Sequence, residues 1–165
     1  AIGCKRGEKF NSKDIRYEKI IIMTDADVDG AHISTLLMAF FYKEFPKLID
    51  EGHLYLSVPP LYRITKGSKI LYAVNDKHKD EIIKKEFKGS EVNINRFKGL
   101  GEMMPAQLKE TTMSPDNRTL LKVQIASKDK KSTLKSVDAL MGKKPELRFK
   151  FIVENSKKIS AENIL

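Results

Sequence analysis

The fold of this chain is decided by the stretch Lys19-Ile20-Ile21-Ile22-Met23-Thr24-Asp25-Ala26-Asp27-Val28-Asp29-Gly30. Its first half is a run of β-branched residues, which is typical of a strand buried on both faces in a parallel sheet. Its second half places three aspartates directly after that strand. Because open parallel sheets bind their ligands beyond the carboxyl ends of the strands, the aspartates are expected to form a functional site.

The three aspartates predict a site for a divalent cation. If the segment is extended, alternate spacing puts Asp25, Asp27 and Asp29 on one side of it, where their charges repel unless a cation neutralises them. Carboxylate oxygens are hard ligands, so the expected metal is Mg²⁺, with Mn²⁺ or Ca²⁺ as substitutes, rather than zinc.

Four chemical interpretations compete for this run. An EF-hand is excluded, because its loop needs a preceding helix and a Glu at the twelfth position, where this chain has Leu36. A phosphotransferase would use Asp25 as nucleophile and Asp27 as acid and base. A Mg²⁺ site that only stabilises charge during phosphodiester cleavage and rejoining is a further alternative. A solvated acidic turn without a function is the fourth.

Composition narrows the class of partner. The chain has 165 residues and a net charge of +9, from 31 Lys and Arg against 22 Asp and Glu. A basic chain with an acidic site suits a polyanionic substrate and favours nucleic acid. We expect no membrane association and a cytoplasmic location, because no stretch approaches the roughly 20 apolar residues of a membrane span and the first residues lack a secretory signal. The single cysteine, Cys4, excludes an internal disulfide.

The expected fold is α/β: a parallel sheet flanked by helices, with a hairpin insertion and a helical C-terminal tail. Residues 1–125 are expected to form the main domain and 126–165 a basic tail. The expected strands are 19–23, 53–58, 91–97 and 119–125, with a hairpin over 61–74. The expected helices are 32–44, 76–87, 106–112, 127–141 and 146–158, with Asp76 capping the second of them.

A second candidate site follows the expected strand 91–97. In Lys98-Gly99-Leu100-Gly101-Glu102, two glycines let the backbone approach a phosphate, and the lysine can neutralise it. The spacing is not that of a Walker A loop. Glu102 is open to interpretation as a ligand, a helix-terminal charge or a surface carboxylate.

Four motifs in order resemble one family. The first is the aspartate run continued through Ala31-His32-Ile33, and the others are Pro59-Pro60-Leu61-Tyr62, Arg96-Phe97-Lys98-Gly99-Leu100-Gly101-Glu102-Met103 and Glu110-Thr111-Thr112-Met113. Together they resemble the B subunits of bacterial type IIA topoisomerases over most of residues 15–125. The phrase Met104-Pro105-Ala106-Gln107-Leu108-Lys109 looks more like the topoisomerase IV branch than the gyrase branch.

The resemblance implies that the chain contains the C-terminal part of a TOPRIM domain. Asp25 and Asp27 would hold the metal, and Asp29 would orient or assist as a third catalytic residue. A Glu of an upstream Glu-Gly-Asp-Ser-Ala motif, outside this chain, would complete the site. Lys98 in the glycine loop would contact DNA.

Two further DNA contacts are implied, each with a structural alternative. His32 would contact the DNA backbone, or its imidazole would cap the following helix. Arg148 falls where the family's tail approaches DNA, although it could equally be an exposed charge on a helix face.

The resemblance also implies the reaction and the partners. A tyrosine on the A subunit would attack a phosphate of double-stranded DNA, within an A2B2 heterotetramer. ATP would be bound by a domain that is absent from this chain, and the chain alone would be inactive. A non-catalytic DNA-binding module is the alternative from another class.

Overall fold

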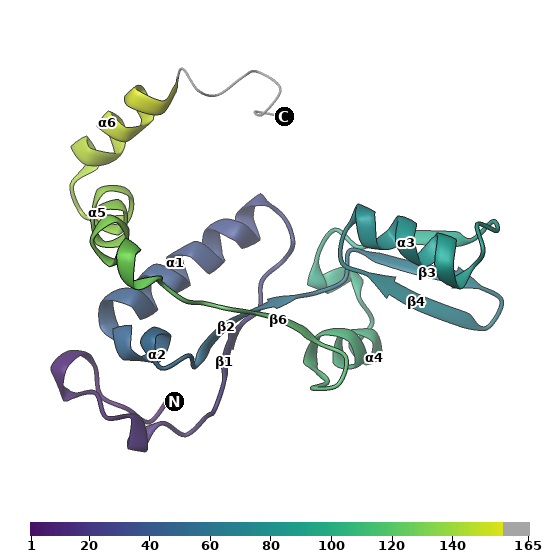
Figure 1. Cartoon of the computed structure of the whole chain (residues 1–165), viewed down its shortest axis with the longest axis horizontal. Coiled ribbons are helices and arrows are strands. Elements are labelled where there is room, and N and C mark those ends of the chain that lie inside the picture. Colours follow the sequence, from purple (N-terminus) through teal and green to yellow (C-terminus); the bar gives the residue numbers. More distant parts are fainter. Residues whose placement is uncertain (157–165) are drawn as a thin grey trace. The chain divides into compact units, whose positions relative to one another are not determined.

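The structure is a computed structural model that describes residues 1–156. The chain divides into two compact units, Ala1–Val123 and a second that begins at Gln124. The first unit opens with two short 3₁₀ turns, Gly7–Lys9 and Ser12–Asp14, and then contains two three-stranded sheets (Figure 1).

The first sheet carries the aspartate run at the end of its edge strand. Strand β1 (Ile20–Ile22) pairs in parallel with β2 (Leu54–Val58), and β2 pairs antiparallel with β6 (Thr119–Lys122). The expected parallel pairing in this sheet is therefore confirmed for β1 and β2. The sheet as a whole is mixed, because β6 runs against its neighbour.

Helix α1 (Val28–Glu44) connects the parallel strands and begins four residues earlier than expected. Asp27 is its N-cap, and the Gly30 N–H donates to Asp27 Oδ1 over 2.7 Å. The extended conformation expected for the aspartate run is therefore wrong, because Asp29 lies in the first helical turn. The helix ends before Pro46, which begins the short helix α2 (Pro46–Asp50).

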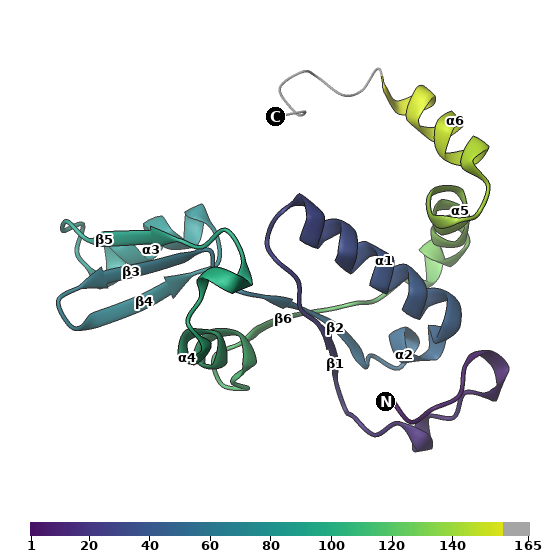
Figure 2. The same ribbon diagram turned by 180° about the vertical axis from the view of Figure 1, so that it is seen from behind.

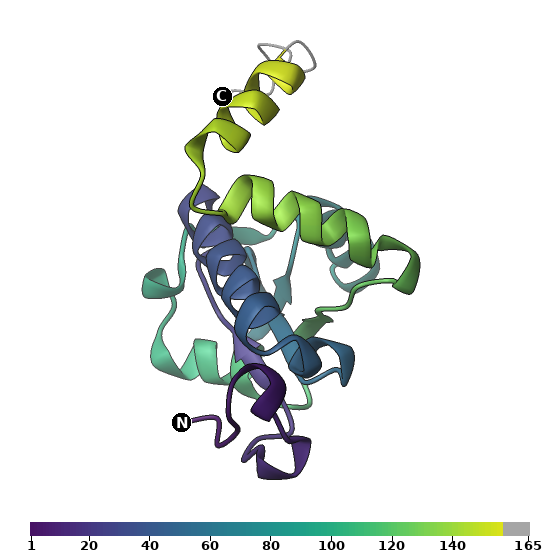
Figure 3. The ribbon, with the colours of Figure 1, turned by 90° about the vertical axis from the view of Figure 1, so that its left-hand side faces the viewer.

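The core of this half lies between the helices and the sheet. Figure 3 shows α1 flanking the strands on one side. Leu48 and Leu54 are fully buried, and the ring of Phe40 meets the rings of Phe41 and Phe45 edge to face, with centroids 5.4 and 5.9 Å apart. Leu54 pairs with Ile20 of β1, so this core includes the strand beside β1.

The second sheet contains the expected hairpin. Strands β3 (Tyr62–Lys66) and β4 (Lys69–Ala73) form it, and β5 (Asn93–Arg96) pairs antiparallel with β3 (Figure 2). Helix α3 (Asp76–Glu86) covers this sheet. The buried core here consists of Tyr62, Ile64, Ala73 and Phe87, with Ile82 and Ile83 of α3 packed against it.

The cap of α3 corrects one expectation. The Asn75 side chain, rather than Asp76, accepts a free N–H of the first turn, that of His78, over 2.8 Å. Asp76 is the first helical residue, so its carboxylate is available for other partners.

The connection back to β6 and the second unit are helical. A 3₁₀ turn (Leu100–Glu102) is followed by α4 (Pro105–Leu108), which runs into a π-helical turn (Lys109–Met113). The second unit has a 3₁₀ turn (Ser127–Asp129), α5 (Lys130–Met141) and α6 (Pro145–Ser156). The expected end of the last helix, at 158, lies outside the described residues. Over residues 1–156, no helix has the length and apolar character needed to span a membrane.

Candidate metal and nucleic-acid site

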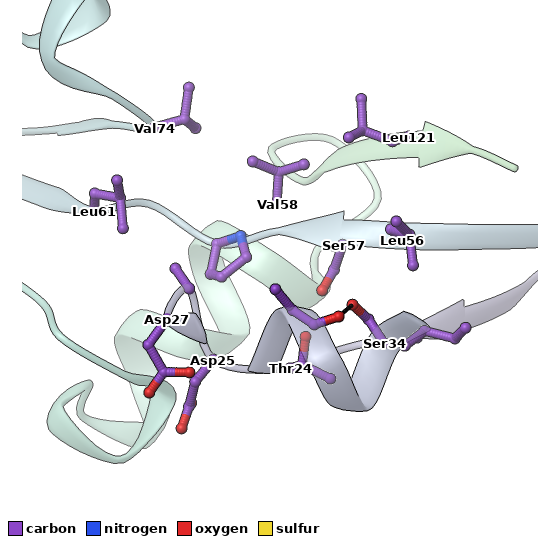
Figure 4. A pocket seen from close by; sticks show the side chains of 14 residues that line it. Thr24, Asp25, Asp27, Ser34, Leu56, Ser57, Val58, Leu61, Val74 and Leu121 are labelled. Atoms are coloured by element: carbon purple, nitrogen blue, oxygen red, sulfur yellow. Dashed lines mark hydrogen bonds between the residues drawn. The ribbon is translucent and has the colours of Figure 1, made fainter. Parts of the chain in front are cut away.

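Asp25 and Asp27 form the centre of the candidate site. Both line a pocket of about 310 Å³ between β1, β2, β6 and the start of α1. Figure 4 shows the two carboxylates at the same side of this pocket. The sequence therefore predicted correctly that these side chains lie at the end of β1, whereas helix α1 carries Asp29 away into its exposed first turn.

The glycine loop lies directly against Asp25. The Leu100 N–H donates to Asp25 Oδ1 over 2.7 Å. A Cβ on Gly99 would lie 3.1 Å from the Asp25 carboxylate, closer than most such contacts. A glycine at position 99 therefore lets Asp25 approach the loop closely. The sequence had indicated the approach of a phosphate instead as the reason for this glycine.

Glu102 has a definite partner in the same loop. The Lys98 N–H donates to Glu102 Oε2 over 2.8 Å, so the glutamate closes the loop on itself. This bond is a fourth possibility beside the three open interpretations, and sequence reasoning missed it. The side chains of Lys98 and Glu102 are exposed.

Gly30 fixes Asp25 from the other side. A Cβ at Gly30 would lie 2.1 Å from the backbone oxygen of Asp25, a distance that real Cβ atoms do not show. The turn from β1 into α1 therefore requires glycine at this position. Two glycines from distant parts of the chain therefore lie close to the same aspartate.

The donor atoms suit a hard cation. Asp25 and Asp27 each use Oδ1 to accept one backbone N–H, which leaves Oδ2 of each carboxylate for a metal. Carboxylate oxygens are the ligands that Mg²⁺ prefers. Over residues 1–156, no three His, Cys, Asp or Glu side chains are grouped closely enough to hold a metal ion.

The pocket beside the aspartates has largely apolar walls. Leu56 and Val58 of β2, Leu121 of β6, and Leu61 and Val74 from the second half of the unit line it (Figure 4). Thr24, Ser34 and Ser57 add polar groups to the lining. The buried Oγ of Ser57 has no hydrogen-bond partner among the described residues.

The three expected DNA contacts lie in different surroundings. His32 is exposed on α1 and does not cap it, since Asp27 does. Arg148 belongs to the second unit, where it is half-buried and its Nη1 donates to the Gly142 oxygen over 2.6 Å. The alternative of an exposed helix-face charge is therefore wrong for Arg148, which ties α6 to the end of α5.

A polar cluster on the second sheet was also missed. Asp76 accepts hydrogen bonds from Lys79 Nζ over 2.9 Å and from the hydroxyl of buried Tyr62 over 2.8 Å. The bond from Lys79, followed by that from Tyr62, holds the pKa of Asp76 below its ordinary value. Lys79 also lies 4.8 Å from the centre of the Tyr62 ring. The available signal was the Asn75-Asp76 pair, since only one of two adjacent residues can be the cap.

Two family models match the chain. The Toprim domain model matches residues 4–59, and the model described as DNA gyrase B subunit, carboxyl terminus, matches residues 89–153. The fold and the strand-end aspartates agree with the first. The chain belongs to the family of type IIA topoisomerase B subunits, as its motifs suggested.

The relatives give a finer comparison. The B subunit of DNA topoisomerase 4 from Bartonella bacilliformis is 59% identical over 157 residues, which are 94% of this chain and 23% of the relative. The corresponding protein of Caulobacter vibrioides is 55% identical over 162 residues, 98% of this chain and 23% of the relative. The B subunit of DNA gyrase from Clostridium acetobutylicum is 48% identical over 161 residues, which are 96% of this chain and 25% of the relative. The chain spans about a quarter of the length of the curated relatives that it matches.

Proposed function

We propose that this chain supplies part of the Mg²⁺-dependent DNA cleavage and religation centre of a type IIA topoisomerase. The observation that carries the proposal is the pair Asp25 and Asp27, held at the end of β1 with one oxygen each left for a metal. The higher identity to B subunits of topoisomerase 4 than to that of gyrase favours topoisomerase IV, and thus decatenation and relaxation of DNA.

The residues of this chain would hold and orient the reacting groups. Asp25 and Asp27 would bind the metal, and Asp29 would assist from the first turn of α1. A bound Mg²⁺ would supply charge stabilisation at the reacting phosphate. The nucleophile would be a tyrosine of the partner A subunit, in an A2B2 assembly whose ATP is bound by another domain of the B subunit.

Side chains in each unit would contact the DNA backbone. Lys98 and His32 are exposed in the first unit, and Arg148 is half-buried in the second. Contacts of this kind position a duplex without reading its sequence. A cytoplasmic location is proposed with this activity.

The decisive experiment substitutes Asp27 in the complete B subunit, assembled with its A subunit. Asp27→Asn removes the charge but retains a good N-cap for α1, so the fold is preserved. We expect Mg²⁺-dependent DNA cleavage to fall at least about 10²-fold, the usual loss when an electrostatic contribution to the transition state is removed. Gel assays of cleaved plasmid measure this directly.

The matched control is Asn75→Ala, which removes the cap of α3 on the second sheet. It should lower stability and leave cleavage intact. Undiminished cleavage by Asp27→Asn would refute the proposed function. An acid-labile phosphate on Asp25 would instead support the phosphotransferase alternative.

A further inference from the structure

Glu102 lies in the glycine loop but is not next to the aspartates in sequence. Its carboxylate accepts the Lys98 N–H over 2.8 Å, and two residues further the Leu100 N–H donates to Asp25 over 2.7 Å. The two bonds share the same short backbone segment. The bond to Glu102 therefore restrains the backbone of Lys98–Leu100, and this backbone positions the Leu100 N–H that donates to Asp25.

This dependence has a physical basis in the local structure. Glu102 lies at the end of a single 3₁₀ turn, Leu100–Glu102, with Gly99 before it and Gly101 within it. Glycine residues lose the most conformational freedom when they become ordered. A charge-assisted hydrogen bond across the turn offsets part of that loss. Without it, the loop has only its own short turn to hold the Leu100 N–H in line.

We propose that Glu102 is a positioning residue that orients Asp25 for metal binding through the backbone of Lys98–Leu100. The inference rests on the proposed function, since it assigns Asp25 to the metal. In this arrangement the Leu100 N–H donates to Oδ1 of Asp25 and restrains the carboxylate, so that Oδ2 would remain for the metal. Partners that orient metal ligands in this way typically alter metal affinity about 10- to 100-fold.

The role is distinct from direct ligation by Glu102. A general base needs the negative charge of the carboxylate, and a ligand to a divalent cation is weakened by its loss, whereas an acceptor for the Lys98 N–H needs only an oxygen. Glu102→Gln keeps such an oxygen, and Glu102→Ala removes it. The two variants therefore separate positioning from direct chemistry.

The test uses the full-length B subunit in complex with its A subunit. Hydrogen–deuterium exchange is measured over the peptide that contains Lys98–Leu100, and metal affinity is measured by titration with Mn²⁺ followed by electron paramagnetic resonance. For Glu102→Ala we expect exchange to rise about tenfold and Mn²⁺ affinity to fall about tenfold. Glu102→Gln should stay close to the unaltered protein in both. Glu81→Ala, an exposed glutamate on α3, is the control and should change neither.

A double variant shows whether the effect passes through Asp25. When Asp25→Asn has already weakened Mn²⁺ binding, adding Glu102→Ala should cause no further loss. The proposal is overturned if Glu102→Gln lowers Mn²⁺ affinity as much as Glu102→Ala does. It is also overturned if the losses of Mn²⁺ affinity from Asp25→Asn and Glu102→Ala add, or if Glu102→Ala speeds exchange and leaves Mn²⁺ affinity unchanged. Failure of the proposed function is distinguishable, since it appears as intact cleavage by Asp27→Asn.

Discussion

Two glycines from distant parts of the sequence lie close against Asp25. Gly30 contacts its backbone and Gly99 its carboxylate, and in both cases the limit is the space available for a Cβ. The Leu100 N–H orients Asp25 without a metal, which is what the proposed function would require of a metal ligand. Such preorganisation is the usual requirement of a functional site.

Gly30→Ala gives a prediction in which two effects oppose each other. Helix propensity alone would make alanine about 1 kcal/mol more stable in α1. The contact at 2.1 Å with the Asp25 backbone should outweigh this and lower the free energy of unfolding by about 1–3 kcal/mol, as overpacking does. Urea unfolding measures the sign.

Gly101→Ala is the matched control for this substitution. An added Cβ there meets nothing within 4 Å, so the change in stability should stay within about 0.5 kcal/mol. A Gly30→Ala protein more stable than the unaltered one would show that α1 can shift away from Asp25.

At the scale of elements, β3 and α3 are joined by the cluster around Asp76. Lys79, and then Tyr62, stabilise the charged form of Asp76 and lower its pKa from the ordinary value of 3.8. A carboxylate whose pKa is lower in the folded state stabilises the protein above the unfolded pKa. That contribution is lost as the pH falls from about 4 through the lower, folded value.

Asp76→Asn should therefore change the pH dependence of stability. We expect the unaltered protein to be more stable than the variant near pH 6, and the difference to narrow as the pH falls below about 4. Urea midpoints measured between pH 6 and pH 2 test this. In the control Asp116→Asn, in an exposed turn, no narrowing is expected. If the difference in stability between the unaltered protein and Asp76→Asn stayed constant over this pH range, the charge of Asp76 would contribute nothing to folding.

At the scale of the whole molecule, the positive charge is concentrated towards the C-terminus. Residues 126–165 contain 10 Lys and Arg against 5 Asp and Glu, and so contribute 5 of the 9 net charges. A polyanion such as DNA gains affinity from such charge through the release of counterions. The second unit is accordingly proposed to contribute to DNA binding.

Arg148 provides the test for this contribution, in the full-length B subunit with its A subunit. Arg148→Ala should weaken binding to duplex DNA and reduce the slope of log affinity against log salt concentration by about 1. Arg148→Lys keeps the charge and should keep the slope, although it changes the bond to the Gly142 oxygen. Fluorescence anisotropy over a range of salt concentrations measures both. An unchanged slope for Arg148→Ala would leave Arg148 only its structural role between α5 and α6.

The sequence by itself determined the order of the motifs, the α/β class, the parallel pairing of β1 with β2 and the family. These follow from local patterns: a β-branched run, an acidic turn, an amphipathic helix and a glycine loop. Most element boundaries were predicted to within a few residues, since caps and prolines are also local signals.

Only the tertiary structure decided how the site is built. It places Asp27 as the cap of α1, Asp29 within the helix, and the Leu100 N–H on Asp25, 75 residues away. It also reverses the direction of β6 relative to β2. The bond from Leu100 and the direction of β6 depend on atoms far apart in the chain, and periodicity along the sequence does not contain that information. The Asp27 cap spans only three residues, but the same run also fits an extended strand end, so its pattern alone did not decide between the two. The aspartates could be found from the sequence, whereas what holds them could not.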